Sequence, residues 1–238
     1  MSRPPVLYER DIELQASEVL EAYERLSGSP IGLPVPIERI AHQVLDLPVV
    51  WEPLDSLPGK EVVSKYKHAG FGKPAYIALN ERLINTSFEQ YRGLENTAIA
   101  HETGHGIFHA ERGRVSQLNF GLADAEELVS FTTDFLDPFA EALVQRGPVE
   151  DDWWREWQAH TFMRYVLMPR FLVEPLLRQG GYDQWKGAGG LYDLRDRCGV
   201  TISALVTHLS KMKCIHVDKH RVIRKVTPVA VGQARLAM

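Results

Sequence analysis

A five-residue motif constrains the fold of this chain more than any other feature of its sequence: His101, Glu102, Thr103, Gly104 and His105 follow one another. Residues four positions apart on an α-helix lie on the same face, one turn from each other. On a helix, the two imidazoles can therefore both reach one Zn²⁺ ion at about 2.0–2.1 Å. We predict a helix over residues 94–109 that presents both histidines to a metal ion.

Glu102 is predicted to lie beside the metal and not among its ligands, because it follows His101 by one position. There it can take a proton from a zinc-bound water, whose pKa the ion lowers from about 15.7 to roughly 7. The hydroxide attacks a peptide carbonyl that the metal polarises, and Glu102 passes the proton to the leaving nitrogen. The motif thus predicts hydrolysis, with Glu102 as general base and then general acid.

The context of the motif matters, because five-residue matches of this kind also occur by chance. Gly104 and Gly106 each cost a helix about 1 kcal/mol relative to alanine. Their presence in the predicted helix indicates that something packs closely against it near the metal. The alternative interpretation is a pair of partly exposed histidines on an ordinary amphipathic helix.

A catalytic zinc site needs a third protein ligand and an open position. His109 lies one further turn along the helix, about 6 Å beyond His105 along the axis, which is too far to share the ion. The other candidates are acidic side chains later in the chain, and the residues alone do not choose among them: Glu126, Glu127, Asp134, Glu141 and Glu156.

Size, charge and cysteine content indicate an intracellular protein. The chain has 238 residues and a net charge of −4, which argues against general nucleic-acid binding. No apolar stretch approaches the roughly 18 residues of a membrane span, and the first residues lack the apolar core of a secretory signal. Cys198 and Cys214 form no disulfide framework. We expect a cytoplasmic protein; the sequence does not predict its oligomeric state.

The periodicity of apolar residues predicts an α+β fold. A small, mainly antiparallel sheet packs on the helix at 94–109, and a helical part at 176–238 with a basic tail covers the other side. The expected strands cover 47–51, 61–66 and 75–79. The expected helices cover 8–27, 37–44, 94–109, 153–168, 171–178, 191–197 and 202–211.

Residues 110–152 form an acidic insert, with ten acidic side chains and three arginines. Two helices are predicted within it, over 123–135 and 139–144, with Pro138 between them. A lid, an inhibitory segment, a dimer contact and a source of a rival metal ligand all fit this composition. The sequence leaves the role of the insert open.

Four separated blocks of the chain resemble the ImmA/IrrE family of metallopeptidases. In the last block, Glu156-Trp157-Gln158-Ala159 begins a segment similar to the family's E-x-x-A-N…L-M-P pattern. The blocks follow the family's order and are distributed over most of the chain, which is more specific than the short motif. They are Leu33–Ala41, Tyr76–Asn80, Ala98–His109 and Glu156–Pro169.

The resemblance implies a zincin-like metallopeptidase domain over residues 1–175, with one Zn²⁺ held by His101, His105 and Glu156. The sequence departs from the family at His160, where relatives carry Asn, and in the length of the acidic insert. His160 is a candidate catalytic residue: it can orient a ligand, bind the metal or donate to the transition state. An ordinary, partly buried histidine is the plain alternative.

Relatives of this kind are cytosolic, and several cleave a helix-turn-helix transcriptional repressor, so the resemblance implies a protein substrate. We expect strand 75–79 to offer an edge to which an extended substrate adds. A metal hydrolase acting on another bond is one alternative. Another is a non-catalytic regulator that keeps the fold and binds a protein or DNA, although direct binding of nucleic acid is not expected. Glu102 argues against the regulator, because a structural metal site needs no base.

Overall fold

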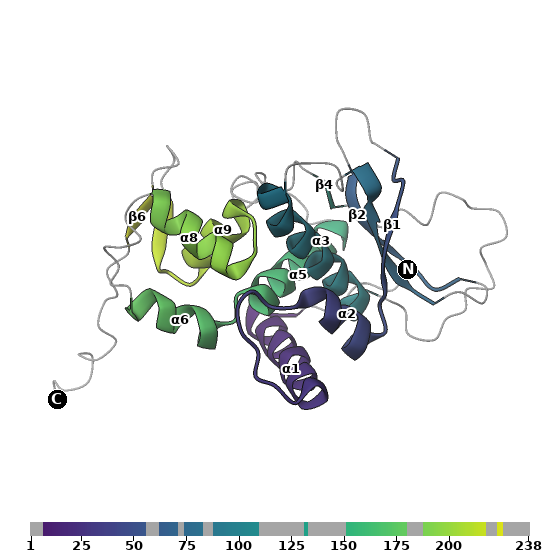
Figure 1. Ribbon diagram of the computed structural model, residues 1–238, viewed down its shortest axis with the longest axis horizontal. Helices are drawn as coiled ribbons and strands as arrows, with labels where there is room; N and C mark the ends of the chain where they lie inside the picture. Colours follow the sequence, from purple (N-terminus) through teal and green to yellow (C-terminus); the bar gives the residue numbers. More distant parts are fainter. Residues whose placement is uncertain are drawn as a thin grey trace.

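The structure is a computed structural model that describes residues 7–55, 62–70, 74–82, 88–109, 131–132, 151–179, 188–217 and 223–225. In this part of the chain the fold is α+β, and α3 and α5 lie between a small sheet and the C-terminal helices (Figure 1). The helices are α1 (Glu9–Ser27), α2 (Ile37–Leu45), α3 (Phe88–Phe108), α5 (Asp151–Leu167), α6 (Arg170–Gln179), α8 (Ala188–Cys198) and α9 (Ile202–Lys211). The strands are β1 (Val49–Glu52), β2 (Val62–Lys67), β3 (Tyr76–Asn80), β4 (Phe131–Thr132), β5 (Ile215–Val217) and β6 (Ile223–Lys225).

The main sheet has the strand order β1-β3-β2-β4. β2 pairs antiparallel with both β3 and β4, as predicted for a mainly antiparallel sheet, whereas β1 pairs parallel with β3. The expectation that residues 75–79 form a free edge is wrong. β3 has a strand on each side, because β1 fills the edge that the antiparallel β2–β3 pair leaves unpaired.

One face of this sheet packs on α3 and forms the main core. Ile77 and Leu79 of β3 are fully buried in the same cluster as Ile99 of α3. Every residue from Thr97 to His105 is buried, polar side chains included. A helix buried around its whole circumference lacks a polar stripe, so α3 is the central element of the fold.

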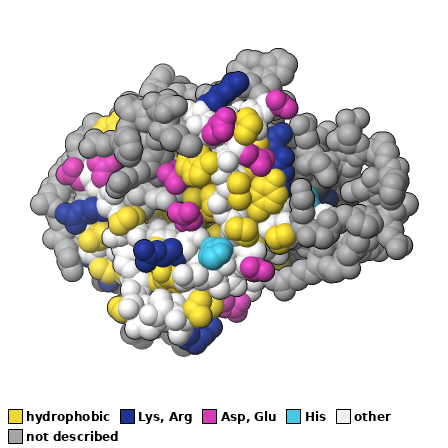
Figure 2. Space-filling view, turned by 45° about the vertical axis from the view of Figure 1, so that its right-hand side comes forward, with side chains coloured by type: hydrophobic (Ala, Val, Ile, Leu, Met, Phe, Trp, Pro, Cys, Tyr) yellow, Lys and Arg dark blue, Asp and Glu magenta, His cyan; other side chains and the backbone are white. Residues whose placement is uncertain are grey.

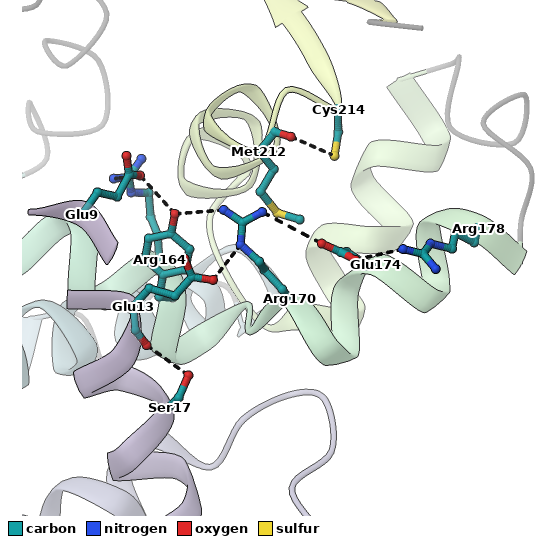
Figure 3. A network of polar contacts seen from close by, with 10 residues as sticks. Glu9, Glu13, Ser17, Arg164, Arg170, Glu174, Arg178, Met212 and Cys214 are labelled. Carbon is teal, nitrogen blue, oxygen red and sulfur yellow. Dashed lines mark hydrogen bonds and ion pairs between the residues drawn. The ribbon is translucent and has the colours of Figure 1, made fainter. Parts of the chain in front are cut away.

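α1 is joined to α5 and α6 by polar contacts (Figure 3). The hydroxyl of Tyr165 donates to a carboxylate oxygen of Glu9 over 3.1 Å. The Nε of Arg170 donates to Glu13 over 2.6 Å. These bonds hold the C-terminal end of α5 and the start of α6 against α1, and so help to fix the orientation of α5.

The predicted helices and strands are confirmed where the structure describes them, although several bounds differ by a few residues and one segment has a different structure. α3 begins at Phe88, earlier than predicted. Phe131–Thr132 forms strand β4 where a helix over 123–135 was predicted, because these residues pair with β2. The rest of the acidic insert up to residue 150 lies outside the described residues, and its role stays open.

α8 and α9 cover the side of the fold away from the sheet, as expected for the C-terminal part. Leu194 and Leu205 belong to the same hydrophobic cluster as Ile12 of α1. The domain boundary near residue 175 stays a prediction. Much of the basic tail lies outside the described residues, and the part that is described forms the hairpin β5–β6.

β1 is an edge strand of the main sheet. Val50 and Trp51 on this strand are partly exposed. Figure 2, which brings the sheet side of the molecule forward, shows hydrophobic side chains gathered among charged ones in the described part of this face. Among the described helices, none combines the length and the apolar character needed to cross a membrane.

Candidate metal centre

The candidate metal centre lies where α3 crosses α5, and Gly104 allows the two helices to approach closely. A Cβ atom at position 104 would lie 2.9 Å from the Cα of Ala159 and 3.1 Å from its carbonyl oxygen. Both neighbours are backbone atoms of α5, so no side chain fits there. This explains why a helix-destabilising glycine occupies the motif, and it brings the histidine face of α3 onto α5.

His101, His105 and Glu156 converge at this crossing. The Nε2 atoms of the two histidines lie 3.0 Å apart. One carboxylate oxygen of Glu156 lies 3.4 Å from His101 Nε2, and the other lies 3.0 Å from His105 Nε2. The three side chains are buried, and their ligand atoms all lie within 4.8 Å of one another. This group can hold a metal ion.

These separations fit a small tetrahedral ion. Two atoms that bind one ion at about 2.0–2.1 Å in tetrahedral geometry lie about 3.3 Å from each other. The two imidazole nitrogens, 3.0 Å apart, lie close to this value, and each approaches a different oxygen of Glu156, at 3.4 and 3.0 Å. Two imidazole nitrogens and one carboxylate form the donor set typical of catalytic zinc.

The carboxylate of Glu156 is an anion in a buried position. Burial by itself raises the pKa of this group, but the imidazoles of His101 and His105 offset the effect and hold the pKa well below its ordinary value. Its two oxygens face the Nε2 atoms of His101 and His105, at 3.4 and 3.0 Å. A buried charge needs a partner, and a cation between the carboxylate and the two imidazoles supplies one.

Glu102 is fully buried on α3 and is not one of the three grouped ligands, as the sequence predicted. Its Oε1 atom accepts a hydrogen bond from the hydroxyl of Ser64 on β2, at 2.7 Å. The candidate base is therefore tied to the sheet, whereas the candidate ligands belong to the two crossing helices.

His160 lies one turn after Glu156 on α5 and contacts the site without joining the three grouped ligands. Its Nε2 atom is 4.0 Å from a carboxylate oxygen of Glu156, which is too long for a hydrogen bond. Its ring centroid is 4.3 Å from that of His101. Burial and then the nearby His101 lower its pKa well below the ordinary value, so the ring is neutral.

His109 is not a ligand in this arrangement, as the sequence predicted. Its Nε2 atom lies 3.1 Å from the carbonyl oxygen of Arg155. A carbonyl oxygen only accepts, so the imidazole donates. Burial, followed by the nearby His105, lowers the pKa of His109 to about 3. The neutral ring connects the end of α3 to the residue that precedes Glu156.

The four rival acidic ligands of the insert lie outside the described residues: Glu126, Glu127, Asp134 and Glu141. Ser64 was not among the site residues predicted from the sequence. The only signal for it was a single hydroxyl in the otherwise apolar start of β2, and this signal does not identify a partner 38 positions away.

Comparison of the sequence with models of known protein families gives no match, and comparison with curated proteins gives none either. The resemblance to the ImmA/IrrE family therefore stays a prediction that is based on the four blocks of residues.

Proposed function

We propose that this protein is a zinc-dependent endopeptidase with a zincin-like fold, which hydrolyses a peptide bond in a protein substrate. One observation carries the proposal: His101, His105 and Glu156 converge on one buried point, and Glu102, which follows His101 on the same helix, is fully buried as well. A structural metal site has no use for an additional buried carboxylate beside it, whereas hydrolysis needs a base there.

His101, His105 and Glu156 would hold the ion as three protein ligands, which leaves one position for water or substrate. When bound, zinc supplies Lewis acidity, which polarises a carbonyl group and makes water more acidic. The carboxylate of Glu102 accepts the proton of the attacking water. It then delivers this proton to the nitrogen of the leaving amine, so that one group acts as base and as acid.

His160 is proposed to donate a hydrogen bond to the oxygen on which negative charge develops. Its ring is neutral, so it carries one N–H donor, and it lies against the ligands His101 and Glu156. Donors placed before the reaction at such an oxygen stabilise the transition state. This assigns to His160 a role in turnover that is separate from metal binding.

The resemblance to the ImmA/IrrE family extends the proposal to the substrate and the compartment. The family pattern matches Glu156, which the structure brings to the two histidines. We therefore propose a cytoplasmic peptidase whose substrate is a protein such as a helix-turn-helix transcriptional repressor.

Metal analysis of the purified protein tests the site. We expect about one zinc per chain in the native protein, and a loss of zinc in both His101→Ala and Glu156→Ala. His42→Ala is the matched control, because His42 is exposed on α2 and distant in sequence from the motif. A native protein that binds no zinc when the ion is added back would overturn the proposal.

Hydrolysis of unfolded casein and of a mixed peptide pool tests the reaction. Zinc-loaded native protein should cleave bonds in these probes, whereas Glu102→Gln should keep its zinc and lose activity by several orders of magnitude. Equal activity of the two proteins would assign the cleavage to a contaminant. A zinc protein that cleaves neither probe nor repressor-type proteins would favour the non-catalytic regulator or a hydrolase of another bond.

A further inference from the structure

We infer that Ser64 is a positioning residue for the base: its hydroxyl holds one oxygen of Glu102, so that the other oxygen carries the proton during hydrolysis. The inference rests on the proposed function and adds to it a residue from the sheet. Its basis is the 2.7 Å hydrogen bond from Ser64 Oγ to Glu102 Oε1, which joins β2 to α3.

The position of Ser64 in the sheet is one that an apolar residue normally fills. Ser64 pairs with Leu79 and Tyr66 pairs with Ile77, so these four side chains share the face that packs on α3. Ser64 is fully buried there. A buried hydroxyl stabilises a fold only when it has a partner, and the partner here is the carboxylate of Glu102.

A local irregularity of β2 changes the alternation of side chains just before Ser64, so that Val62 and Ser64 lie on different faces. The pairing with β4 shifts its register between Val62 and Ser64, as in a β-bulge. Val62 packs with Leu54 and Ala78 in a separate cluster, although in a regular strand it would share a face with Ser64. Bulges beside active sites commonly redirect a side chain in this way.

Anchoring one oxygen restricts the rotation of the whole carboxylate. Glu102 belongs to α3, so its backbone moves with the candidate ligands His101 and His105, whereas one oxygen of its carboxylate is held from the sheet by Ser64. A carboxylate that is already oriented takes the proton without first losing rotational freedom. Loss of this hydrogen bond should therefore lower kcat and leave zinc binding unchanged.

Two substitutions of equal shape provide the test, because threonine keeps a hydroxyl and valine lacks it. We expect Ser64→Val to have a kcat about tenfold or more below that of Ser64→Thr, with the same zinc content and KM on a cleaved peptide. Steric strain from the additional methyl group is common to both variants, so the comparison isolates the hydroxyl. Equal kcat values for Thr and Val would overturn the inference.

Ser64→Ala provides a second measurement that needs no peptide hydrolysis. Acetohydroxamate binds zinc and passes a proton to a correctly placed base, so its affinity for the zinc-loaded protein reports the orientation of Glu102. We expect about tenfold weaker binding in Ser64→Ala, and no further loss when the same change is made in Glu102→Gln. An unchanged affinity in Ser64→Ala would contradict a positioning role, as would an equal loss in the Glu102→Gln background.

These measurements separate the failure of the inference from the failure of the proposed function. A native protein without zinc overturns both. Zinc and hydroxamate binding that depends on Ser64, without cleavage of any peptide, supports the positioning of Glu102 and overturns the peptidase. Peptide cleavage that does not depend on Ser64 supports the peptidase and overturns the inference. A simultaneous loss of zinc and of thermal stability in both Ser64→Ala and Ser64→Val would assign Ser64 a structural role. This result would also overturn the inference.

Discussion

His109 donates its Nε2–H to the carbonyl oxygen of Arg155 over 3.1 Å, which joins the end of the motif helix to the residue before Glu156. The third histidine of the motif helix therefore contacts the backbone of α5 beside the candidate metal site, and it is not one of the three grouped side chains. Groups that orient ligands in this way typically change metal affinity by about 10–100-fold when they are removed.

We expect His109→Ala to keep about one zinc per chain but to bind it about tenfold more weakly. Competition with a chromogenic chelator measures this affinity, and His101→Ala provides the reference for a lost ligand. Should His109→Ala lose zinc as completely as His101→Ala, His109 would be a ligand and the assignment of the site would be wrong.

Gly104→Ala should destabilise the protein by about 1–3 kcal/mol, as overpacked core positions do. The additional Cβ would lie 2.9 Å from the Cα of Ala159, so α3 and α5 must move apart. The gain in helix propensity, about 1 kcal/mol, acts in the opposite direction. The free energy of unfolding, measured by urea denaturation, should decrease. The affinity for zinc should decrease as well, because the candidate ligands belong to the two helices that move apart.

Gly32→Ala is the control for this prediction, because a Cβ at position 32 meets nothing within 4 Å. Its stability should stay close to that of the native protein. If Gly104→Ala is as stable as Gly32→Ala and binds zinc equally well, the close approach of the two helices is not needed for the site.

His160→Leu should keep its zinc and lose kcat by about 100-fold, because a neutral N–H donor to the developing charge is removed. His160→Asn carries the residue of the ImmA/IrrE pattern, which also has an N–H donor, and should keep most of the activity. Zinc content and peptide hydrolysis of the two variants decide this. A loss of zinc in His160→Leu would instead indicate that His160 binds the metal, and full activity would assign it to packing alone.

The buried side chain of His208 on α9 should make the folded protein less stable in acid. Burial, and then the positive charges of Arg164 and Arg170, lower its pKa from 6.5 to about 3. In the unfolded chain, His208 therefore becomes protonated as the pH falls below 6.5, whereas in the folded chain it stays neutral down to about pH 3. Between these two pH values, the titration of His208 should lower the free energy of unfolding by about 1.4 kcal/mol for each unit by which the pH falls.

His208→Gln should remove this contribution and flatten the decline of stability between pH 6.5 and 4. Urea denaturation at several pH values, in the presence of a chelator so that zinc does not interfere, measures the slope. His42→Gln changes an exposed histidine and should leave the slope as in the native protein. An identical slope in His208→Gln would show that His208 does not titrate between the two states in this window.

The elements that the sequence predicted well are those set by local periodicity. α1, α2 and the motif helix follow from apolar residues at helical spacing, and their predicted bounds agree with the structure apart from the start of α3. β4 was predicted as helix, because its pairing with β2 joins residues far apart in the chain. Periodicity within a segment contains no information about such a partner.

The free edge predicted at residues 75–79 was wrong for the same reason. A strand pattern identifies β3 but not its neighbours, and β1 pairs with β3 although β2 lies between them in the sequence. His109 shows the opposite case: the rise of a helix is fixed, so the sequence alone excluded it as a ligand. Geometry within one element is predictable, whereas adjacency between elements is not.

The sequence by itself determined the facing pair His101 and His105 and the offset of Glu102, because helical geometry fixes where residues one and four positions apart lie. Only the tertiary structure brought Glu156 to this pair and Ser64 to Glu102, through the crossing of α3 with α5 and the packing of β2 on α3. Both contacts depend on how closely separate elements approach, and that distance is set by side-chain volume at the interface: Gly104 leaves room for Ala159 of α5, and Gly106 leaves room for Tyr66 of β2.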